Sequence, residues 1–222
     1  AGNQTSVHAK DITLAYVNFP PYEFENNGNP DGILVLIVQK IFEEAGIPLK
    51  LKHLPFKRAY QYVKAGNGQI DGLFNFYKIE KRLPFFDYSE PIIKNPLVFF
   101  LRKDTVFHFK EVSDLKGMSL GILRGYTYGS DFDDNPDFTK SVADSHLMNF
   151  KKLVLGRIDA YPCDKLVGLH VAIKEKLMPE LVTYPVPLKI MDGHIGFTKG
   201  RHQKTIRKIN RAISTIHQNG EI

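Results

Sequence analysis

The sequence predicts an α/β protein with two similar lobes, each a mostly parallel sheet flanked by helices. Two observations lead to this fold class. Strand-like and helical apolar patterns alternate as β-α-β-α-β over residues 1–76, and a shorter copy of that order recurs downstream. The segments YQYVKAGNGQIDGLFNF (60–76) and MNFKKLVLGRIDAYPCD (148–164) also align as a weak internal repeat of helix, glycine, Ile-Asp and strand.

The elements of the first lobe are predicted from the spacing of apolar residues and from Gly, Pro and Asn residues that indicate turns and helix ends. Gly46 is the expected C-cap of the first helix, and AGNG (65–68) ends the second. In order, the expected elements are a strand (12–17), a Pro/Gly/Asn loop (18–32), a helix (34–45), a strand (49–54), a helix (56–63) and a strand (70–76).

The second lobe repeats part of this order. We expect a strand at 118–123, a Gly/Tyr-rich loop, a helix that runs to Gly156, and a strand at 158–161. Asp71 and Asp159 occupy equivalent places in the repeat, and both are interpreted as structural residues that turn a helix into a strand.

Two extended segments, 89–104 and 184–200, should carry the chain between the lobes, and the last helix should then pack on lobe 1. Two crossings make a hinge, so a cleft between the lobes is expected. The predicted boundaries are 1–93 and 193–222 for lobe 1, 94–192 for lobe 2, and 92–97 and 188–194 for the hinge.

Charge and composition narrow the possible classes. The formal charge is +6, and the densest basic stretch is 199–211. Ile206, Ile209, Ile213 and Ile216 recur there at helical spacing, which predicts an amphipathic helix with a solvated basic face. Nucleic-acid binding is disfavoured because no aromatic platform accompanies the charge.

Neither a membrane span nor a signal segment is visible in the chain. No run of about 18 apolar residues exists, so no transmembrane helix is expected. The N-terminal AGNQTSVHAKD has no apolar signal core, which predicts a protein that is either not exported or already processed.

Enzyme and metal signatures are scarce. HExxH, GxSxG and the P-loop are absent. GNGQIDG (66–72) precedes a strand, whereas a dinucleotide-binding fingerprint follows one. The eight histidines lack paired metal-ligand spacing, and Cys163, the single cysteine, is interpreted as a small buried residue. We therefore expect no catalytic residue, metal or cofactor.

Polar and aromatic residues instead follow the predicted strands, at the edge where open α/β sheets bind ligands. An Arg offers a two-pronged donor to a carboxylate, and an Asp accepts hydrogen bonds from an ammonium group. This set predicts a site for a zwitterion. Its members are Asn18, Phe19, Tyr22, Asn75, Phe76, Tyr77, Arg82, Arg124, Gly125, Tyr126, Thr127, Tyr128 and Asp164.

Five further segments, taken together in their order and spacing along the chain, indicate a known family. They are FPPYEFENNGNPDG (19–32), PFKRAYQYVKAGNGQIDGLF (55–74), EKRLPFFDYSEPI (80–92), VSDLKGMSLGILRGYTYG (112–129) and GRIDAYPCD (156–164). Together they resemble the bacterial extracellular solute-binding proteins of the amino-acid type, family 3. The resemblance covers nearly the whole chain. It implies a type II periplasmic-binding-protein fold, in which two hinge strands join two α/β lobes.

The resemblance also implies ligand-binding residues. Arg82 matches the arginine that holds the ligand's α-carboxylate, and Gly125 and Thr127 match a loop that helps to hold it. Asp164 matches the residue that accepts the α-ammonium group.

Aromatic positions are implied as well. Phe19 matches a residue that stacks on the ligand, and Phe56 lies where relatives place a side chain of the pocket wall. Relatives often carry small residues ahead of the arginine, whereas this chain has NFYK (75–78), which predicts a more aromatic pocket containing Asn75 and Phe76.

Two further arginines leave alternatives open. Arg58 and Arg124 resemble a less-characterised branch of the family. Each either faces the cleft and favours an anionic ligand, or forms a surface or inter-lobe ion pair. Arg124 and its neighbour Tyr126 are counted among the candidate ligand-binding residues.

The function implied is a monomeric periplasmic or lipid-anchored receptor. It would capture an amino acid or small carboxylate for the permease of an ABC importer and bind no nucleic acid. One alternative is the ligand-binding module of a signalling receptor. Another is an enzyme similar to cyclohexadienyl dehydratases, for which Glu23 and Asp164 are the nearest candidate acids.

Overall fold

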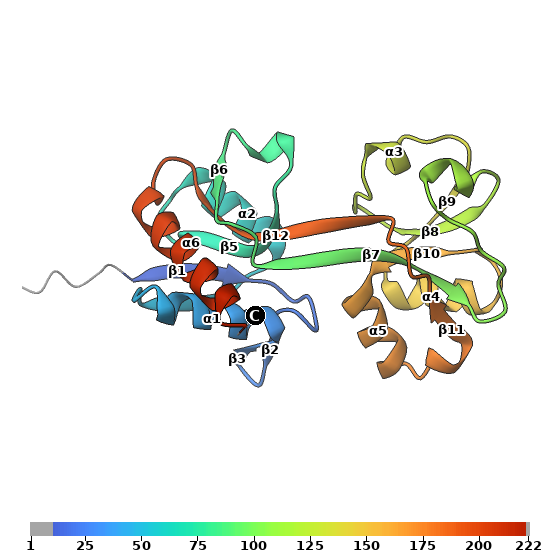
Figure 1. Ribbon diagram of the computed structural model, residues 1–222, viewed down its shortest axis with the longest axis horizontal. Helices are drawn as coiled ribbons and strands as arrows, with labels where there is room; N and C mark the ends of the chain where they lie inside the picture. Colours follow the sequence, from blue (N-terminus) through green and yellow to red (C-terminus); the bar gives the residue numbers. More distant parts are fainter. Residues whose placement is uncertain (1–10, 221–222) are drawn as a thin grey trace, which may run out of the picture. The chain divides into compact units, whose positions relative to one another are not determined.

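The computed structural model describes residues 11–220, which form two compact units (Figure 1). Unit 1 comprises the chain up to Lys94 and again from Asp192, and unit 2 comprises residues 95–191. The chain leaves unit 1 within strand β7 (Ile93–Arg102) and returns within β12 (Lys189–Thr198). The α/β class predicted from the sequence is confirmed.

Unit 1 contains a mixed sheet with the strand order β12-β5-β1-β4. Strand β1 runs parallel to β4 and β5, whereas β12 runs antiparallel to β5 and to β6. Its other elements are β1 (Ile12–Tyr16), the hairpin β2 (Phe24–Asn26) and β3 (Asn29–Asp31), α1 (Ile33–Glu44), β4 (Leu49–His53), α2 (Phe56–Ala65), β5 (Gly72–Tyr77), a 3-10 turn (Glu80–Arg82), β6 (Phe86–Tyr88) and α6 (Gln203–Gln218).

The helices of unit 1 form where the apolar spacing predicts them. Helix α6 buries one stripe of apolar residues while its Lys and Arg side chains stay exposed, and it contacts α1. Helix α2 ends at Gly66, whose φ of 61° lies in the left-handed region that glycine adopts without a steric penalty. The predicted Pro/Gly/Asn loop contains the β2–β3 hairpin, which sequence spacing alone did not reveal.

Unit 2 is built around β7, whose neighbours β10 and β11 both pair with it in antiparallel fashion. A second sheet consists of the parallel strands β8 and β9. The elements are a 3-10 turn (Val112–Leu115), β8 (Ser119–Leu123), α3 (Ser130–Asp133), β9 (Thr139–Ala143), α4 (His146–Val154), β10 (Tyr161–Asp164), α5 (Lys165–Lys174), a 3-10 turn (Met178–Glu180) and β11 (Leu181–Thr183).

Strand β7 separates two apolar cores in unit 2. Val98 and Phe100 pack into one core and Phe99 and Leu101 into the other. Successive side chains of a strand point to opposite faces, so an uninterrupted apolar run is required here rather than an alternating one. The run LVFFL therefore marks a strand with a core on each face.

One strand of unit 2 begins later than predicted. Strand β10 starts at Tyr161 rather than residue 158, because the preceding residues bond to β8 instead. Asp159 contacts Ser119, and Ala160 makes an isolated parallel bridge to Leu120. Asp164 is consequently the last residue of a strand and not a residue beyond its end. Strand β9 was not predicted.

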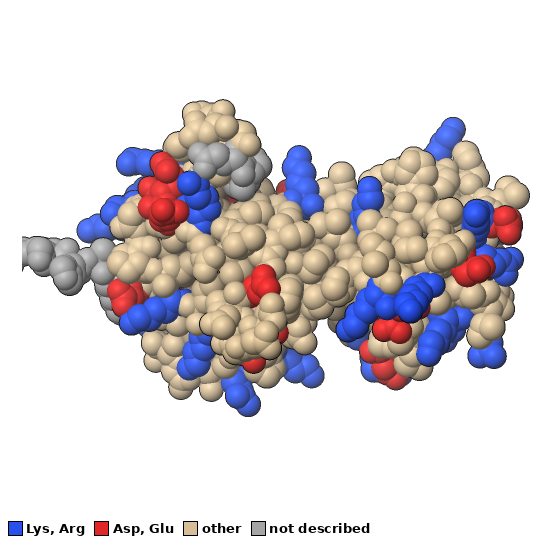
Figure 2. All heavy atoms as spheres, turned by 90° about the horizontal axis from the view of Figure 1, so that it is seen from below, with Lys and Arg blue, Asp and Glu red and all other residues tan. Residues whose placement is uncertain are grey.

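Charge is dispersed over the surface of both units. Figure 2 shows Lys and Arg side chains spread over one face, with Asp and Glu among them. None of the helices within residues 11–220 combines the length and hydropathy that a bilayer crossing requires.

Candidate functional site

Arg82 closes the 3-10 turn that follows β5 in unit 1. Its Nη1 donates a hydrogen bond to the carbonyl oxygen of Tyr77 at 2.8 Å. The guanidinium carbon lies 4.2 Å from the centroid of the Phe76 ring and 5.9 Å from those of Phe56 and Tyr60. The cation is therefore held by one backbone acceptor and by aromatic faces.

No carboxylate of residues 11–220 forms an ion pair with Arg82. The side chain is half-buried, and burial lowers the pKa of the guanidinium, while Tyr88, Tyr60 and Tyr77 act in the opposite direction. An arginine keeps its charge in proteins despite such a shift. A partly desolvated cation without a counter-ion is well suited to hold an anion, because its guanidinium has more donors than Tyr77 can use.

Phe76 is the centre of the aromatic cluster beneath this cation. It stacks on Tyr88 at 5.7 Å and 9°, and it meets Phe86 edge-on at 4.9 Å. Gly196 on β12 makes room for the ring, since a Cβ there would lie 2.5 Å from the Phe76 Cδ1 atom. Burial raises the pKa of Tyr88 to about 12, so that hydroxyl stays protonated.

Two other predicted residues border this cluster. Phe56, at the start of α2, is 44% exposed and offers an apolar face to solvent. Asn75 has a φ of 51°, a left-handed conformation that Asn tolerates better than most residues. Near it the pairing of β5 with β12 shifts by one residue, as expected for a β-bulge.

The ring of Phe19 pairs with Tyr22 and not with an aromatic residue of the Arg82 cluster. It stacks on Tyr22 at 5.7 Å and 17° and forms an isolated bridge with Glu23. Glu23 is only 1% exposed, and its carboxyl group accepts the Val17 N–H at 3.1 Å. Burial raises the pKa of Glu23 well above its usual value, and the bond to the Val17 N–H holds the buried carboxyl group in the turn.

The loop after β8 in unit 2 is held mainly by its own contacts. The Thr127 hydroxyl donates to Asp133, which also accepts the Tyr128 N–H at 3.0 Å. Gly125 adopts a φ of 79° and gives the loop its turn. Arg124 pairs with Asp144 at 2.6 Å, and both side chains are mostly exposed. Arg124 thus has an ion-pair partner within unit 2, and its assignment to the ligand-binding set stays a prediction.

Asp164 is buried at the junction of β10 and α5. Its Oδ1 accepts the Val167 N–H at 3.0 Å and so caps the helix. The carboxylate also lies at the positive end of the α5 helix dipole. Tyr126 is close enough for Asp164 and Cys163 to raise its pKa, although burial contributes most to that shift.

His146 was missed by sequence reasoning. It is the first residue of α4, after the N-cap Ser145, whose hydroxyl accepts the Met148 N–H at 3.2 Å. The ring of His146 meets that of Tyr126 edge-on at 6.3 Å, and its Nδ1 lies 3.3 Å from the Cys163 Sγ. Only its place at a helix start after a strand could have drawn attention to it.

Cys163 itself is a buried residue of β10, 3% exposed. Burial raises the pKa of its thiol strongly, so the group is not a poised nucleophile. Within the described part of the chain no three His, Cys, Asp or Glu side chains gather as a metal site would require.

Comparison with known proteins accounts for this architecture. The family model of the bacterial extracellular solute-binding proteins, family 3, matches residues 12–222. The chain belongs to this family. Members are solute-binding proteins by description, and the match spans both units. A search of curated proteins gives no match.

Solved structures confirm the two-lobed binding-protein fold. The second substrate-binding domain of a putative amino acid ABC transporter from Streptococcus pneumoniae is 22% identical with a TM-score of 0.74, covering 96% of each chain. GlnP substrate-binding domain 2 of Lactococcus lactis is 26% identical with a TM-score of 0.70, covering 95% of this chain and 91% of the other. A histidine kinase sensor domain is 19% identical with a TM-score of 0.76, covering 96% and 93%.

Proposed function

We propose that this protein is an extracytoplasmic receptor that captures an amino acid, or a closely related carboxylate, and delivers it to an ABC importer. The observation that carries the proposal is Arg82, a half-buried cation with no acidic partner among residues 11–220 and with aromatic faces around it. Such a group binds a carboxylate with two parallel hydrogen bonds.

In this proposal each unit supplies one part of the recognition. Unit 1 holds the carboxylate through Arg82, while Phe56 offers an aromatic face to the rest of the solute. Unit 2 supplies Asp164 for the ammonium group and the 125–127 loop for further hydrogen bonds. The units close by hinge motion in β7 and β12, which excludes water and strengthens the ionic contacts.

The proposed contacts are sufficient for a useful affinity. A micromolar dissociation constant corresponds to about −8 kcal/mol. Hydrogen bonds to charged groups contribute roughly 1.5–3 kcal/mol each. About five of them, two at Arg82 and the others at Asp164 and the 125–127 loop, with one stacked ring contribute roughly 8–16 kcal/mol. The upper part of that range still exceeds about 8 kcal/mol once an entropic penalty of about 4 kcal/mol is subtracted.

The importer is supported by the names of two similar proteins, which are substrate-binding domains of GlnP and of a putative amino acid ABC transporter. At 26% and 22% identity these neighbours do not identify the solute. We propose no enzymatic activity: Glu23 is almost fully buried and Asp164 caps a helix, so neither acid is placed as an open proton donor.

The test is a thermal-shift panel of the twenty amino acids, followed by calorimetric titration of the best ligand against Arg82→Ala. We expect affinity to fall at least about 30-fold, because removing one partner of a buried charge pair costs roughly 2–5 kcal/mol. Arg207→Ala is the matched control, since Arg207 is exposed on α6 and belongs to no candidate ligand-binding set, so this variant should bind like the native protein. Native affinity in Arg82→Ala would overturn the proposal.

A second candidate is the ligand-binding part of a signalling receptor, favoured by the likeness to a histidine kinase sensor domain. That likeness extends to the fold alone at 19% identity. The same ligand would bind in either case. Reading the complete gene decides between them, because a sensor requires a membrane span and a signalling domain on the same chain.

A further inference from the structure

His146 belongs to a buried hydrogen-bonding network in unit 2. Its Nδ1 lies 2.7 Å from the Tyr161 hydroxyl and 3.3 Å from the Cys163 thiol. Tyr161 is fully buried and Cys163 nearly so, whereas His146 is half-buried. The imidazole is therefore the end of the network that lies nearest to solvent.

The direction of the hydrogen bonds can be worked out from the donors present. Burial raises the pKa of both the Tyr161 hydroxyl and the Cys163 thiol, so each keeps its proton near neutral pH. The Tyr161 proton then needs an acceptor. Asn149 does not serve, because its Nδ2 donates to the Ile122 carbonyl at 3.1 Å and its Oδ1 has no hydrogen-bond partner.

The remaining acceptors near Tyr161 are the imidazole Nδ1 and the thiol sulfur. An imidazole nitrogen is much the stronger acceptor of the two. The Tyr161 hydroxyl therefore donates to Nδ1 of His146, and the proton of the neutral imidazole resides on Nε2. Burial also lowers the pKa of His146 to about 4, which keeps the ring neutral around pH 7.

The Nε2–H of His146 has no acceptor among residues 11–220. It lies beside candidate ligand-binding groups, because the ring contacts Tyr126 and the thiol of Cys163, the residue that precedes Asp164. A fixed donor without a partner, next to the groups assigned to the solute, has the character of a recognition element.

We propose that His146 determines specificity by donating its Nε2–H to an oxygen on the side chain of the bound solute. The inference rests on the proposed function and deepens it. The favoured class is an amino acid whose side chain ends in a carbonyl or carboxylate, such as glutamine or glutamate. Side chains that end in guanidinium or ammonium offer only donors and leave the imidazole donor unpaired.

The binding test compares L-glutamine, L-glutamate, L-arginine and L-lysine by calorimetric titration. We expect the native protein to bind the first pair at least about tenfold more tightly than the second, the effect of one hydrogen bond to a charged or polar partner. His146→Phe should lose the preference for glutamine and glutamate while keeping an aromatic ring against Tyr126. His146→Gln should restore most of the affinity because its amide supplies a donor.

The outcomes separate this inference from the proposed function. Preference for arginine or lysine, or unchanged glutamine affinity in His146→Phe, overturns the role of His146 and leaves the receptor intact. Failure of the native protein to bind any of the twenty amino acids or the small carboxylates related to them overturns the proposed function and this inference with it. Circular dichroism of each variant excludes misfolding as the cause of lost binding.

A second measurement needs no ligand. Nitrogen-15 NMR distinguishes the two neutral tautomers of an imidazole, and His146→Gln identifies the signal among the eight histidines. We expect the Nε2–H tautomer at pH 7. The Nδ1–H tautomer, or a protonated ring at that pH, overturns the proposal.

Discussion

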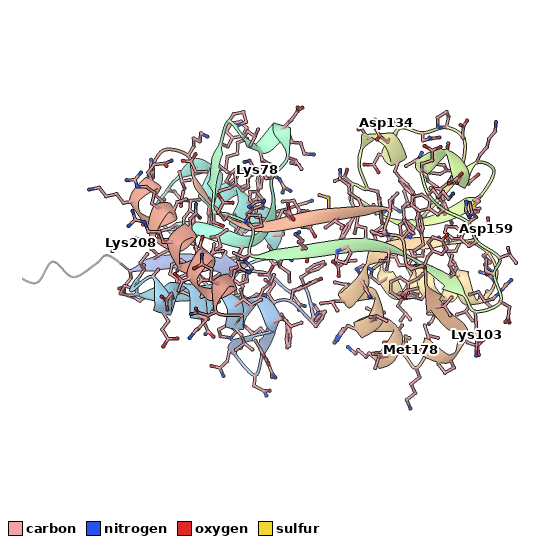
Figure 3. All side chains as sticks on the ribbon, viewed as in Figure 1. Lys78, Lys103, Asp134, Asp159, Met178 and Lys208 are labelled. Carbon is pink, nitrogen blue, oxygen red and sulfur yellow. The ribbon has the colours of Figure 1, made fainter. Side chains whose placement is uncertain are left out.

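Asp71 in unit 1 and Asp159 in unit 2 make the same pair of bonds to a neighbouring strand. Asp71 donates its N–H to the Thr13 carbonyl at 2.8 Å and accepts the Thr13 N–H at 2.9 Å. Asp159 does the same with Ser119, both bonds being 2.7 Å (Asp159 is labelled in Figure 3). The internal repeat therefore preserves a clamp that fixes the start of β1 in unit 1 and the start of β8 in unit 2.

The two units differ after this clamp. Unit 1 continues into β5 and reaches Arg82 within an aromatic cluster. Unit 2 continues into β10 and reaches Asp164, beside a neutral network of Tyr161, Cys163 and His146. The repeat thus specifies the scaffold, and the chemistry at the strand ends is specific to each unit.

The largest expected effect concerns the core of the unit 1 cluster. Phe76→Ala removes a ring that is 1% exposed, which should destabilise the protein by about 3–5 kcal/mol through lost burial and a cavity. Urea unfolding measures the change. Phe56→Ala is the control and should cost under about 1.5 kcal/mol, because that ring is 44% exposed. Equal losses would mean that Phe76 is not the centre of the cluster.

The Asp clamps come next in expected size. Asp71→Ala should destabilise the protein by about 1–3 kcal/mol, the penalty for an unpaired, partly buried N–H. Asp159→Ala should cost less, because the Asp159 side chain is exposed and water can replace it. Hydrogen exchange should show lost protection of the Thr13 N–H in Asp71→Ala and of the Ser119 N–H in Asp159→Ala. Loss of protection in the other unit would contradict a local clamp.

The neutral network predicts a pH dependence for unit 2. The pKa of His146 is lowered from 6.5 to about 4 on folding, so below pH 6.5 the unfolded chain binds the proton more readily. Stability present above pH 6.5 is then lost as the pH falls toward 4, by up to about 3 kcal/mol. Urea unfolding of His146→Gln should show a flatter profile over this range than the native protein.

Glu23 in unit 1 should act with the opposite sign. Burial raises its pKa, so its contribution is present at low pH and is lost as the pH rises from the unfolded value of 4.5 through the folded pKa. Glu23→Gln keeps a neutral group of similar shape and should remove that loss. A steeper loss of stability at rising pH in the variant would contradict the assignment.

The smallest expected effect concerns Arg124. Its pairing with Asp144 is mostly exposed, so Arg124→Ala should change stability by about 0.2–1 kcal/mol. The change should diminish in 1 M salt, where exposed charges are screened within about 3 Å. Weaker ligand binding in this variant, with unchanged stability, would instead return Arg124 to the recognition site.

Much of the fold could be predicted because its signals are local. The helices at 33–44 and 203–218 follow from apolar spacing, and Gly66 marks the end of α2. The start of β10 could not be predicted, since Asp159 and Ala160 have strand-like surroundings in the sequence but bond to β8 instead. The candidate site residues show the same division. Arg82 was predicted from the family-like segment 80–92, whereas no motif in the sequence pointed to His146.

The sequence by itself determined the α/β class, the equivalent places of Asp71 and Asp159, the extended crossing segments and the family to which the chain belongs. Each of these depends on residue type at fixed spacing along the chain. Only the tertiary structure decided which groups share a desolvated environment. Tyr161 and Cys163 lie 15 and 17 residues from His146, and only folding brings these three side chains together as one hydrogen-bonding network. Folding likewise surrounds Arg82 with the rings of Phe56, Tyr60 and Phe76. It places no carboxylate of residues 11–220 within ion-pair distance of the guanidinium.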